Sequence, residues 1–152
     1  MAVLRSRREV LAGTLALGGV FLLPCSADAT PADLAQAIAE VLGGKQAQQG
    51  RIKLEIPRLA ESGLSVPLDV VVDSPMTRED FVETLYLFAE RNPLPNIARF
   101  HMSPLTGRAQ VITRIRLADT QMVTAIAKMS DGTFWQEQVE VVITIAACTE
   151  PA

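Results

Sequence analysis

The residue best placed to do chemistry is Cys148, which only four residues follow in the 152-residue chain. A segment rich in branched residues, 139–145, predicts a strand before it, with two alanines between. Three extended residues reach about 10 Å, at about 3.3 Å each, so the thiol would stand beyond that strand on a short arm. A thiolate there is a nucleophile and an acceptor of sulfur. We expect its neighbours to shape this arm: Ala146, Ala147, Thr149 and Glu150.

Few other groups could act together with this cysteine. The chain has one histidine, His101, and its carboxylates are scattered, so no cluster has the spacing of metal ligands. We therefore expect no metal and no other cofactor. A serine triad, or a cysteine enzyme in which a base activates Cys148, would have to use His101, and that pairing is kept as an alternative. Glycine-rich phosphate loops are absent from the sequence.

Residues 1–29 have the layout of a secretory signal peptide. Arginines near the start precede an apolar run, Leu11 to Leu23, and small residues then precede a plausible cleavage site before Thr30. The run is too short to span a membrane. The opening Ser6-Arg7-Arg8-Glu9-Val10-Leu11 fits a twin-arginine signal, which exports folded proteins. The sequence therefore predicts export to the periplasm.

Export makes the cysteine count informative. Cys25 would be removed with the signal, and Pro24 before it fits a lipid attachment site poorly, so Cys148 would be unpaired in the mature chain. An unpaired cysteine in an oxidising compartment is a liability unless it is buried, linked to another chain or used. Burial is least expected near a chain end. The remaining explanations are that Cys148 pairs with a partner chain or that it has a chemical role. The simpler interpretation is a frayed tail with an incidental cysteine.

Length and charge limit the class of protein. A chain of 152 residues, 49% apolar, can form one domain with its own core. The net charge of −3 provides no basic surface of the kind that phosphate binding needs, so nucleic acid is not the expected partner.

Residues 30–50 are predicted to form a helix and a link. Thr30 and Pro31 are a typical helix start, Gly43-Gly44 ends the segment, and 45–50 is a polar link. One apolar face should pack on the domain, since its members recur at helical spacing: Leu34, Ile38, Val41 and Leu42.

Residues 51–145 are predicted to form an antiparallel β-sandwich of about seven short strands. Residues 81–91 are ambiguous, because Thr77 to Asp80 resembles a helix-starting capping box whereas the segment itself is apolar on both faces. We predict a strand there. The other predicted strands are 51–56, 66–72, 98–102, 109–117, 121–128 and 134–145.

Several longer motifs resemble one family. They are the stretch from Val66-Pro67-Leu68 through Asp73-Ser74-Pro75-Met76-Thr77, the stretch from Phe88 to His101, and residues 113–119 and 129–135. The chain resembles SoxY, the sulfur-carrying subunit of the thiosulfate-oxidising Sox system, over roughly residues 32–150. One departure concerns the arm, which ends in Gly-Gly-Cys-Gly-Gly in the thiosulfate carrier. Here Ala146-Ala147-Cys148-Thr149-Glu150 resembles a related branch with Ala-Ala-Cys-Ile-Glu.

The resemblance implies a fold and a role. It implies an immunoglobulin-like β-sandwich with a flexible C-terminal arm, residues 146–152, that forms a heterodimer with a second β-sandwich subunit, SoxZ. Cys148 would carry sulfur species between sulfur-oxidising partner enzymes in the periplasm, and the carrier would not itself be an enzyme. The Asn92–Phe100 segment would serve the fold or a dimer rather than chemistry.

Two alternatives remain beside the carrier. One is an interaction module that binds a SoxZ-like partner without carrier duty, in which Cys148 is dispensable or links two chains. The other is the cysteine enzyme that needs His101. The cargo, and the choice between a heterodimer and a cysteine-linked homodimer, stay open at this point.

Overall fold

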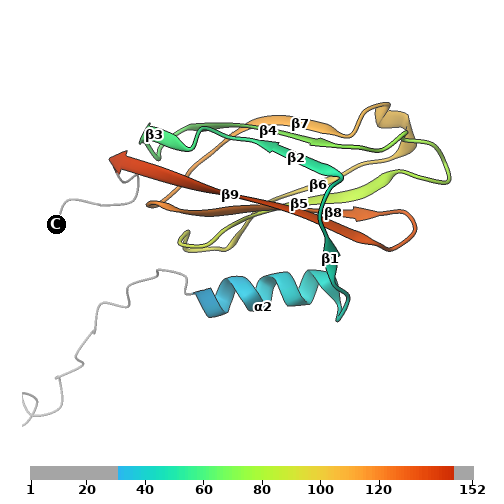
Figure 1. The fold of residues 1–152 in the computed structure, drawn as a ribbon, viewed down its shortest axis with the longest axis horizontal. Coiled ribbons are helices and arrows are strands. Elements are labelled where there is room, and N and C mark those ends of the chain that lie inside the picture. The colour runs from blue at the N-terminus through green and yellow to red at the C-terminus, as the bar shows by residue number, and fades with distance from the viewer. Residues whose placement is uncertain (1–30, 146–152) are drawn as a thin grey trace, which may run out of the picture.

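A computed structural model describes residues 31–145, which form a two-layer β-sandwich with one helix on its outside (Figure 1). The larger sheet has six strands, and the smaller sheet has three. The signal segment 1–29, the arm 146–152 and Thr30 lie outside the described residues. Within the described part, no helix is long and apolar enough to cross a membrane.

The larger sheet is centred on three long antiparallel strands. They are β5 (Val82–Ala89), β8 (Gln121–Met129) and β9 (Phe134–Ile145). On one side β6 (Asn96–His101) pairs with β5. On the other side two short strands, β1 (Ala47–Gln48) and β3 (Leu59–Ser62), pair in parallel with the start and the end of β9.

The smaller sheet has the order β2-β4-β7, all antiparallel. Its strands are β2 (Ile52–Glu55), β4 (Val66–Val72) and β7 (Gln110–Ile115), and a single 3-10 turn, η1 (Pro104–Thr106), lies in the connection from β6 to β7. Alternate residues of β4 point into the core, where Val66, Leu68, Val70 and Val72 are buried. This is the period of two that predicted the strand.

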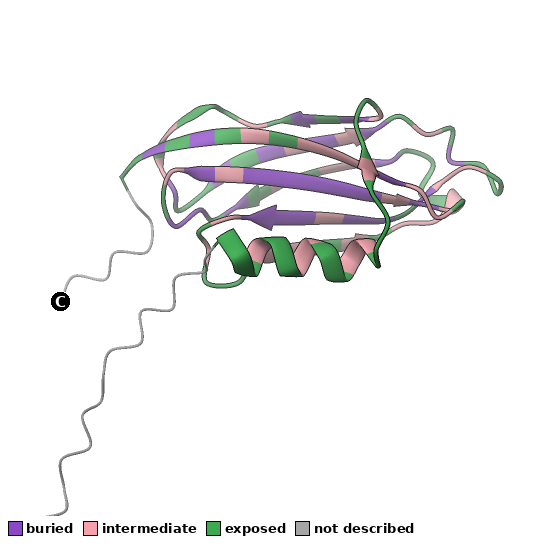
Figure 2. Ribbon diagram, turned by 60° about the horizontal axis from the view of Figure 1, so that its bottom comes forward, coloured by how far each residue is buried: buried purple, intermediate pink, exposed green. Residues whose placement is uncertain are grey.

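The predicted helix is confirmed as α2 (Pro31–Leu42), which lies along the outer face of the larger sheet (Figure 2). It ends at two glycines with positive φ, Gly43 and Gly44, and the Gly43 amide donates to the Ala39 carbonyl at 3.0 Å. Its apolar face packs on three buried residues of the sheet: Phe88, Ile126 and Phe134.

This covering helix explains why β5 is apolar on both faces. Leu85 and Leu87 point between the sheets, whereas Phe88 points outward under the helix, and all three are fully buried. The predicted strand is therefore confirmed. The capping interaction at Thr77 is also present, since its hydroxyl accepts the Asp80 amide at 3.1 Å, but the chain continues into β5 rather than a helix.

The immunoglobulin-like sandwich is confirmed, and two details differ from the prediction. The expected link 45–50 contains β1, and residues 57–65, for which no strand was predicted, contain β3. Both strands were missed because they are short and because their partner, β9, lies far along the chain. They add parallel pairs to a sandwich that was expected to be antiparallel throughout.

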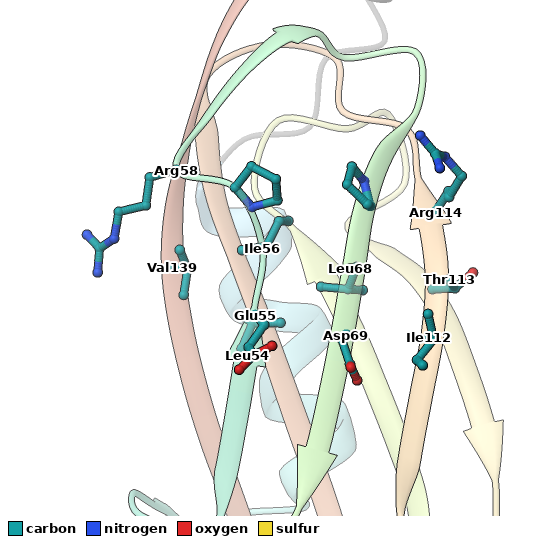
Figure 3. Close-up of a pocket in the computed structure, with 12 residues that line it drawn as sticks. Leu54, Glu55, Ile56, Arg58, Leu68, Asp69, Ile112, Thr113, Arg114 and Val139 are labelled. Carbon is teal, nitrogen blue, oxygen red and sulfur yellow. The ribbon is translucent and has the colours of Figure 1, made fainter.

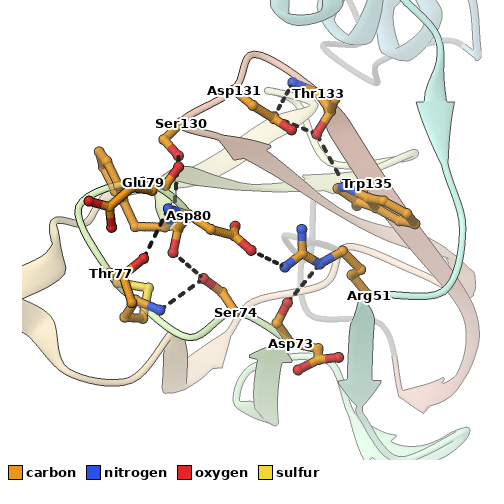
Figure 4. A network of polar contacts seen from close by, with 12 residues as sticks. Arg51, Asp73, Ser74, Thr77, Glu79, Asp80, Ser130, Asp131, Thr133 and Trp135 are labelled. Carbon is orange, nitrogen blue, oxygen red and sulfur yellow. Dashed lines mark hydrogen bonds and ion pairs between the residues drawn. The ribbon is translucent and has the colours of Figure 1, made fainter.

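Side chains close the end of the sandwich where β9 begins, which we call the network end (Figure 4). Arg51 donates to the Asp73 carbonyl at 2.8 Å and to the Asp80 carboxylate at 2.9 Å, and its guanidinium lies 5.7 Å from the Trp135 ring centre. The Ser130 hydroxyl donates to the Glu79 carbonyl and accepts the Phe81 amide. The contacts that hold these loops together therefore come in part from two motifs that resemble SoxY, at residues 73–77 and 129–135.

Candidate functional site

The predicted site lies just past the last described residue. Cys148 and its neighbours Ala146, Ala147, Thr149 and Glu150 are outside the described residues, so the structure describes the strand that leads to them. This strand, β9, is the longest described strand, and it ends at Ile145. We call this end of the sandwich the arm end.

The end of β9 is bonded on both of its edges. Its pairing with β8 stops at Val141, and β3 takes over on the other edge as far as Ile145. The Gly63 amide donates to the Ile145 carbonyl at 3.2 Å, and the Gly63 carbonyl accepts the Leu117 amide at 2.8 Å. The backbone is therefore fixed up to the residue from which the arm departs.

On the β8 side, where the hydrogen bonds between β8 and β9 have ended, a side-chain hydroxyl binds β9 instead. The Thr120 hydroxyl accepts the Ile143 amide at 2.9 Å and lies 3.4 Å from the Ile143 carbonyl, to which it donates. Thr120 lies in the turn between β7 and β8. This contact was missed by the sequence analysis, because no local pattern links a turn threonine to a strand about twenty residues later.

Asn92 joins two loops at the arm end. Its amide donates to the Arg116 carbonyl at 2.8 Å, and its oxygen accepts the Ala118 amide at 2.9 Å and the Gln121 side chain at 3.1 Å. Gln121, which is buried, also accepts the Arg91 amide at 2.8 Å. These bonds support the interpretation that the Asn92–Phe100 segment serves the fold.

His101 lies far from the arm end. His101 pairs with Thr84, Thr84 with Lys128, and Lys128 with Phe134, so the histidine is level with the start of β9. Ile145 is eleven residues further along β9, or about 36 Å at about 3.3 Å per residue. An arm that adds about 10 Å cannot bring Cys148 to this histidine in the same chain. The ring instead contacts the Thr84 hydroxyl, 3.2 Å from its Nδ1.

The ionisable groups whose pKa the fold changes lie away from the arm end. In the part of the chain that the structure describes, no three His, Cys, Asp or Glu residues are grouped as metal ligands would be. Hydrogen bonds from the amide and hydroxyl of Thr133 lower the pKa of Asp131, and a hydrogen bond to Glu83 raises the pKa of Lys128. Both groups lie toward the network end.

A hollow of about 700 Å³ lies over the smaller sheet (Figure 3). Its polar groups are engaged with neighbours rather than aimed at a common point, because Gln110 donates to both oxygens of Asp69 and Lys53 pairs with Glu55. Arg58 points away from the hollow. The arrangement does not resemble a catalytic site.

A family model and a solved structure give the same family. The family model of the sulfur oxidation protein SoxY matches residues 38–148. No curated protein matches the chain. Among solved structures, the sulfur carrier protein SoxY from Chlorobium limicola f thiosulfatophilum is similar at 27% identity and a TM-score of 0.62, covering 75% of this chain and 98% of that chain.

Other solved structures share the fold at lower identity. A superoxide reductase (neelaredoxin) from Ignicoccus hospitalis has 18% identity and a TM-score of 0.54, covering 62% of this chain and 80% of that chain. A putative superoxide reductase from Thermotoga maritima has 15% identity and a TM-score of 0.53, covering 64% and 87%. These likenesses concern the sandwich alone. Because the family model spans most of the sandwich and reaches Cys148, the chain belongs to the SoxY family of sulfur oxidation proteins.

Proposed function

We propose that this protein is a periplasmic sulfur carrier, which holds a sulfur intermediate covalently on Cys148 and presents it to enzymes of sulfur-compound oxidation. The observation that carries the proposal is the SoxY family match, whose last residue is Cys148 itself. The similar Chlorobium protein is described as a sulfur carrier. The carrier is a substrate of its partner enzymes and not an enzyme.

The geometry of the arm end supports this role. β9 is bonded to β3 up to Ile145 on one edge and to Thr120 at Ile143 on the other, and three further residues span at most about 10 Å. A carrier needs its reactive atom beyond the bulk of the domain, where the active site of another protein can enclose it. Ala146 and Ala147, being small, let this short arm enter a narrow channel.

Export and partnership complete the proposal. Residues 1–29 act as a twin-arginine signal, and a SoxZ-like β-sandwich subunit pairs with this chain before or after crossing the membrane. Removal of the signal leaves Cys148 without a second cysteine in the mature chain, so the thiol is free to receive sulfur.

Intact mass measurement on protein from the native periplasm tests the carrier role. We expect a reductant-sensitive adduct of one or more sulfur atoms, or of thiosulfate, that is absent from Cys148→Ser, and we expect that variant to lose all sulfur-dependent turnover. His101→Asn is the matched control and should keep both the adduct and the turnover, because His101 lies about 36 Å from the root of the arm.

The opposite result has a definite meaning. A bare thiol under every growth condition, or only a cysteine-linked dimer, would contradict carriage and favour an interaction module that binds a SoxZ-like partner. Turnover by the purified protein alone, lost in His101→Asn, would instead indicate an enzyme.

A further inference from the structure

One side of the sandwich is bordered by two edge strands. Among the described residues, β6 pairs only with β5, and β7 pairs only with β4. Between them lies a groove of about 520 Å³. Its walls are mostly apolar and include Leu94, Ile97, Phe100 and Ile115. Its rim carries two arginines, Arg114 and Arg116.

The register shows which backbone groups of β7 are free. The Val72 amide donates to the Ala109 carbonyl, so the pairs Val70–Val111 and Leu68–Thr113 are also hydrogen-bonded ones. The alternate residues of β7, Ile112 and Arg114, therefore direct their amides and carbonyls away from β4. Pro67 lies opposite Arg114, where its missing N–H costs no ladder bond.

The backbone of this edge lacks two of the usual protections against pairing. β7 has no proline and no bulge in its register with β4, and the Ile112 side chain is 74% exposed. An edge strand without these breaks is a template for another strand, and the one charge on β7, that of Arg114, favours a strand with acidic side chains. By contrast, the edge strand β6 lies beside a register shift at Leu87 and Phe88 of its partner.

Charge identifies the kind of strand that fits. Residues 91–118, which include β6 and β7, carry five arginines and no aspartate or glutamate, although the whole chain has a net charge of −3. The Arg116 guanidinium is exposed, and no hydrogen bond or ion pair joins it to another residue that the structure describes. A second copy of this chain would bring the same arginines to the edge, and like charges oppose that pairing.

We propose that the side between β6 and β7 binds the acidic edge strand of a second β-sandwich protein, which extends the β2-β4-β7 sheet by one strand. Main-chain bonds to Ile112 and Arg114 supply the pairing. Alternate side chains of the added strand enter the apolar groove, and its carboxylates meet Arg114 and Arg116. The inference rests on the pairing with a SoxZ-like subunit proposed above, and it assigns the surface for that pairing.

Binding of the SoxZ-like subunit to variants of the edge tests the assignment. We expect Arg114→Glu with Arg116→Glu to weaken the affinity about tenfold or more and to flatten its dependence on salt. Arg58→Glu with Arg78→Glu is the matched control, since both residues are exposed arginines outside the groove. Ile112→Pro removes a free amide and should weaken binding by a similar factor, whereas Ile112→Ala keeps that amide.

Hydrogen exchange gives a second readout that does not depend on any variant. Complex formation should protect the amides of Ile112 and Arg114, which have no partner in the β4 ladder. Protection confined to another face, or equal affinities for the groove and control variants, would overturn the assignment and leave the pairing intact. Failure of the two subunits to bind would overturn both. Two further results would contradict the assignment of this edge to the partner. One is homodimerisation through β7, and the other is protection of β7 that vanishes when residues 149–152 are deleted.

Discussion

The two ends of the sandwich are closed by different chemistry. At the network end, the guanidinium of Arg51 joins two loops through the Asp80 carboxylate, the Asp131 carboxylate holds its own turn through Thr133, and the Ser130 hydroxyl adds neutral bonds between loops. At the arm end, neutral amides and a hydroxyl do this, through Asn92 and Thr120 among others. An ion pair at the arm end, between Arg91 and Asp119, is more than half exposed on both sides and contributes little.

This difference bears on function. Neutral hydrogen bonds do not titrate and are not screened by salt, whereas bonds to charged groups respond to both. The bonds that hold the end of β9 therefore depend little on pH and ionic strength. The network end, opposite the end of β9, carries the bonds to charged groups.

The largest expected effect comes from Asn92→Ala, which removes three hydrogen bonds and leaves the buried Gln121 amide with one partner fewer. We expect a loss of about 2–3 kcal/mol in the free energy of unfolding. Urea denaturation measures it. Asn96→Ala is the matched control, because that side chain makes no hydrogen bond to another described residue. Equal losses in the two variants would show that the amide bridge does not close the arm end.

A smaller effect is expected from Thr120→Val, which keeps the shape of the side chain and leaves the Ile143 amide without a partner. The free energy of unfolding should fall by about 1 kcal/mol. The more specific result is faster hydrogen exchange at Ile143 with unchanged exchange at the network end. Thr144→Val, whose hydroxyl donates to the Glu61 carbonyl, should leave the Ile143 amide protected. Uniformly faster exchange would mean that the arm end has no local anchor.

The smallest effect is expected from the titration of Asp131. Because Thr133 lowers its pKa in the folded state below the ordinary value of 3.8, its contribution to stability is present above that value. The contribution is lost as the pH falls through the lowered pKa, and it amounts to a few tenths of a kcal/mol for an exposed group. Unfolding of Asp131→Asn between pH 6 and pH 3 should lack this part of the decline. A steeper decline in the variant would reverse the sign and contradict the comparison.

The sequence predicts best what is local in this fold. The bounds of β4 and β9 follow from alternation and branched residues, and α2 follows from Pro31, the apolar spacing and the two glycines. The position of Cys148 beyond a strong strand is also a local property. β1 and β3 have no such signal, because each exists only through its pairing with β9.

The anchor of the arm escapes prediction for the same reason. The bonds of Gly63 and Thr120 to the end of β9 join turns and a strand that lie far apart in the sequence. The resemblance to SoxY marks Asn92 within a long motif, but only the structure shows that its side chain binds Arg116, Ala118 and Gln121.

The place of β9 has a consequence for synthesis. Among the described strands it leaves the ribosome last, yet it borders β8, β1 and β3 and contributes Val141 and Ile143 to the core. A polypeptide that stops early exposes the edge of β8 and cannot close its core, so it is open to proteolysis and aggregation. Folding therefore depends on a strand that ends only three residues before Cys148 in the sequence, so the fold and the reactive residue share one segment of the chain.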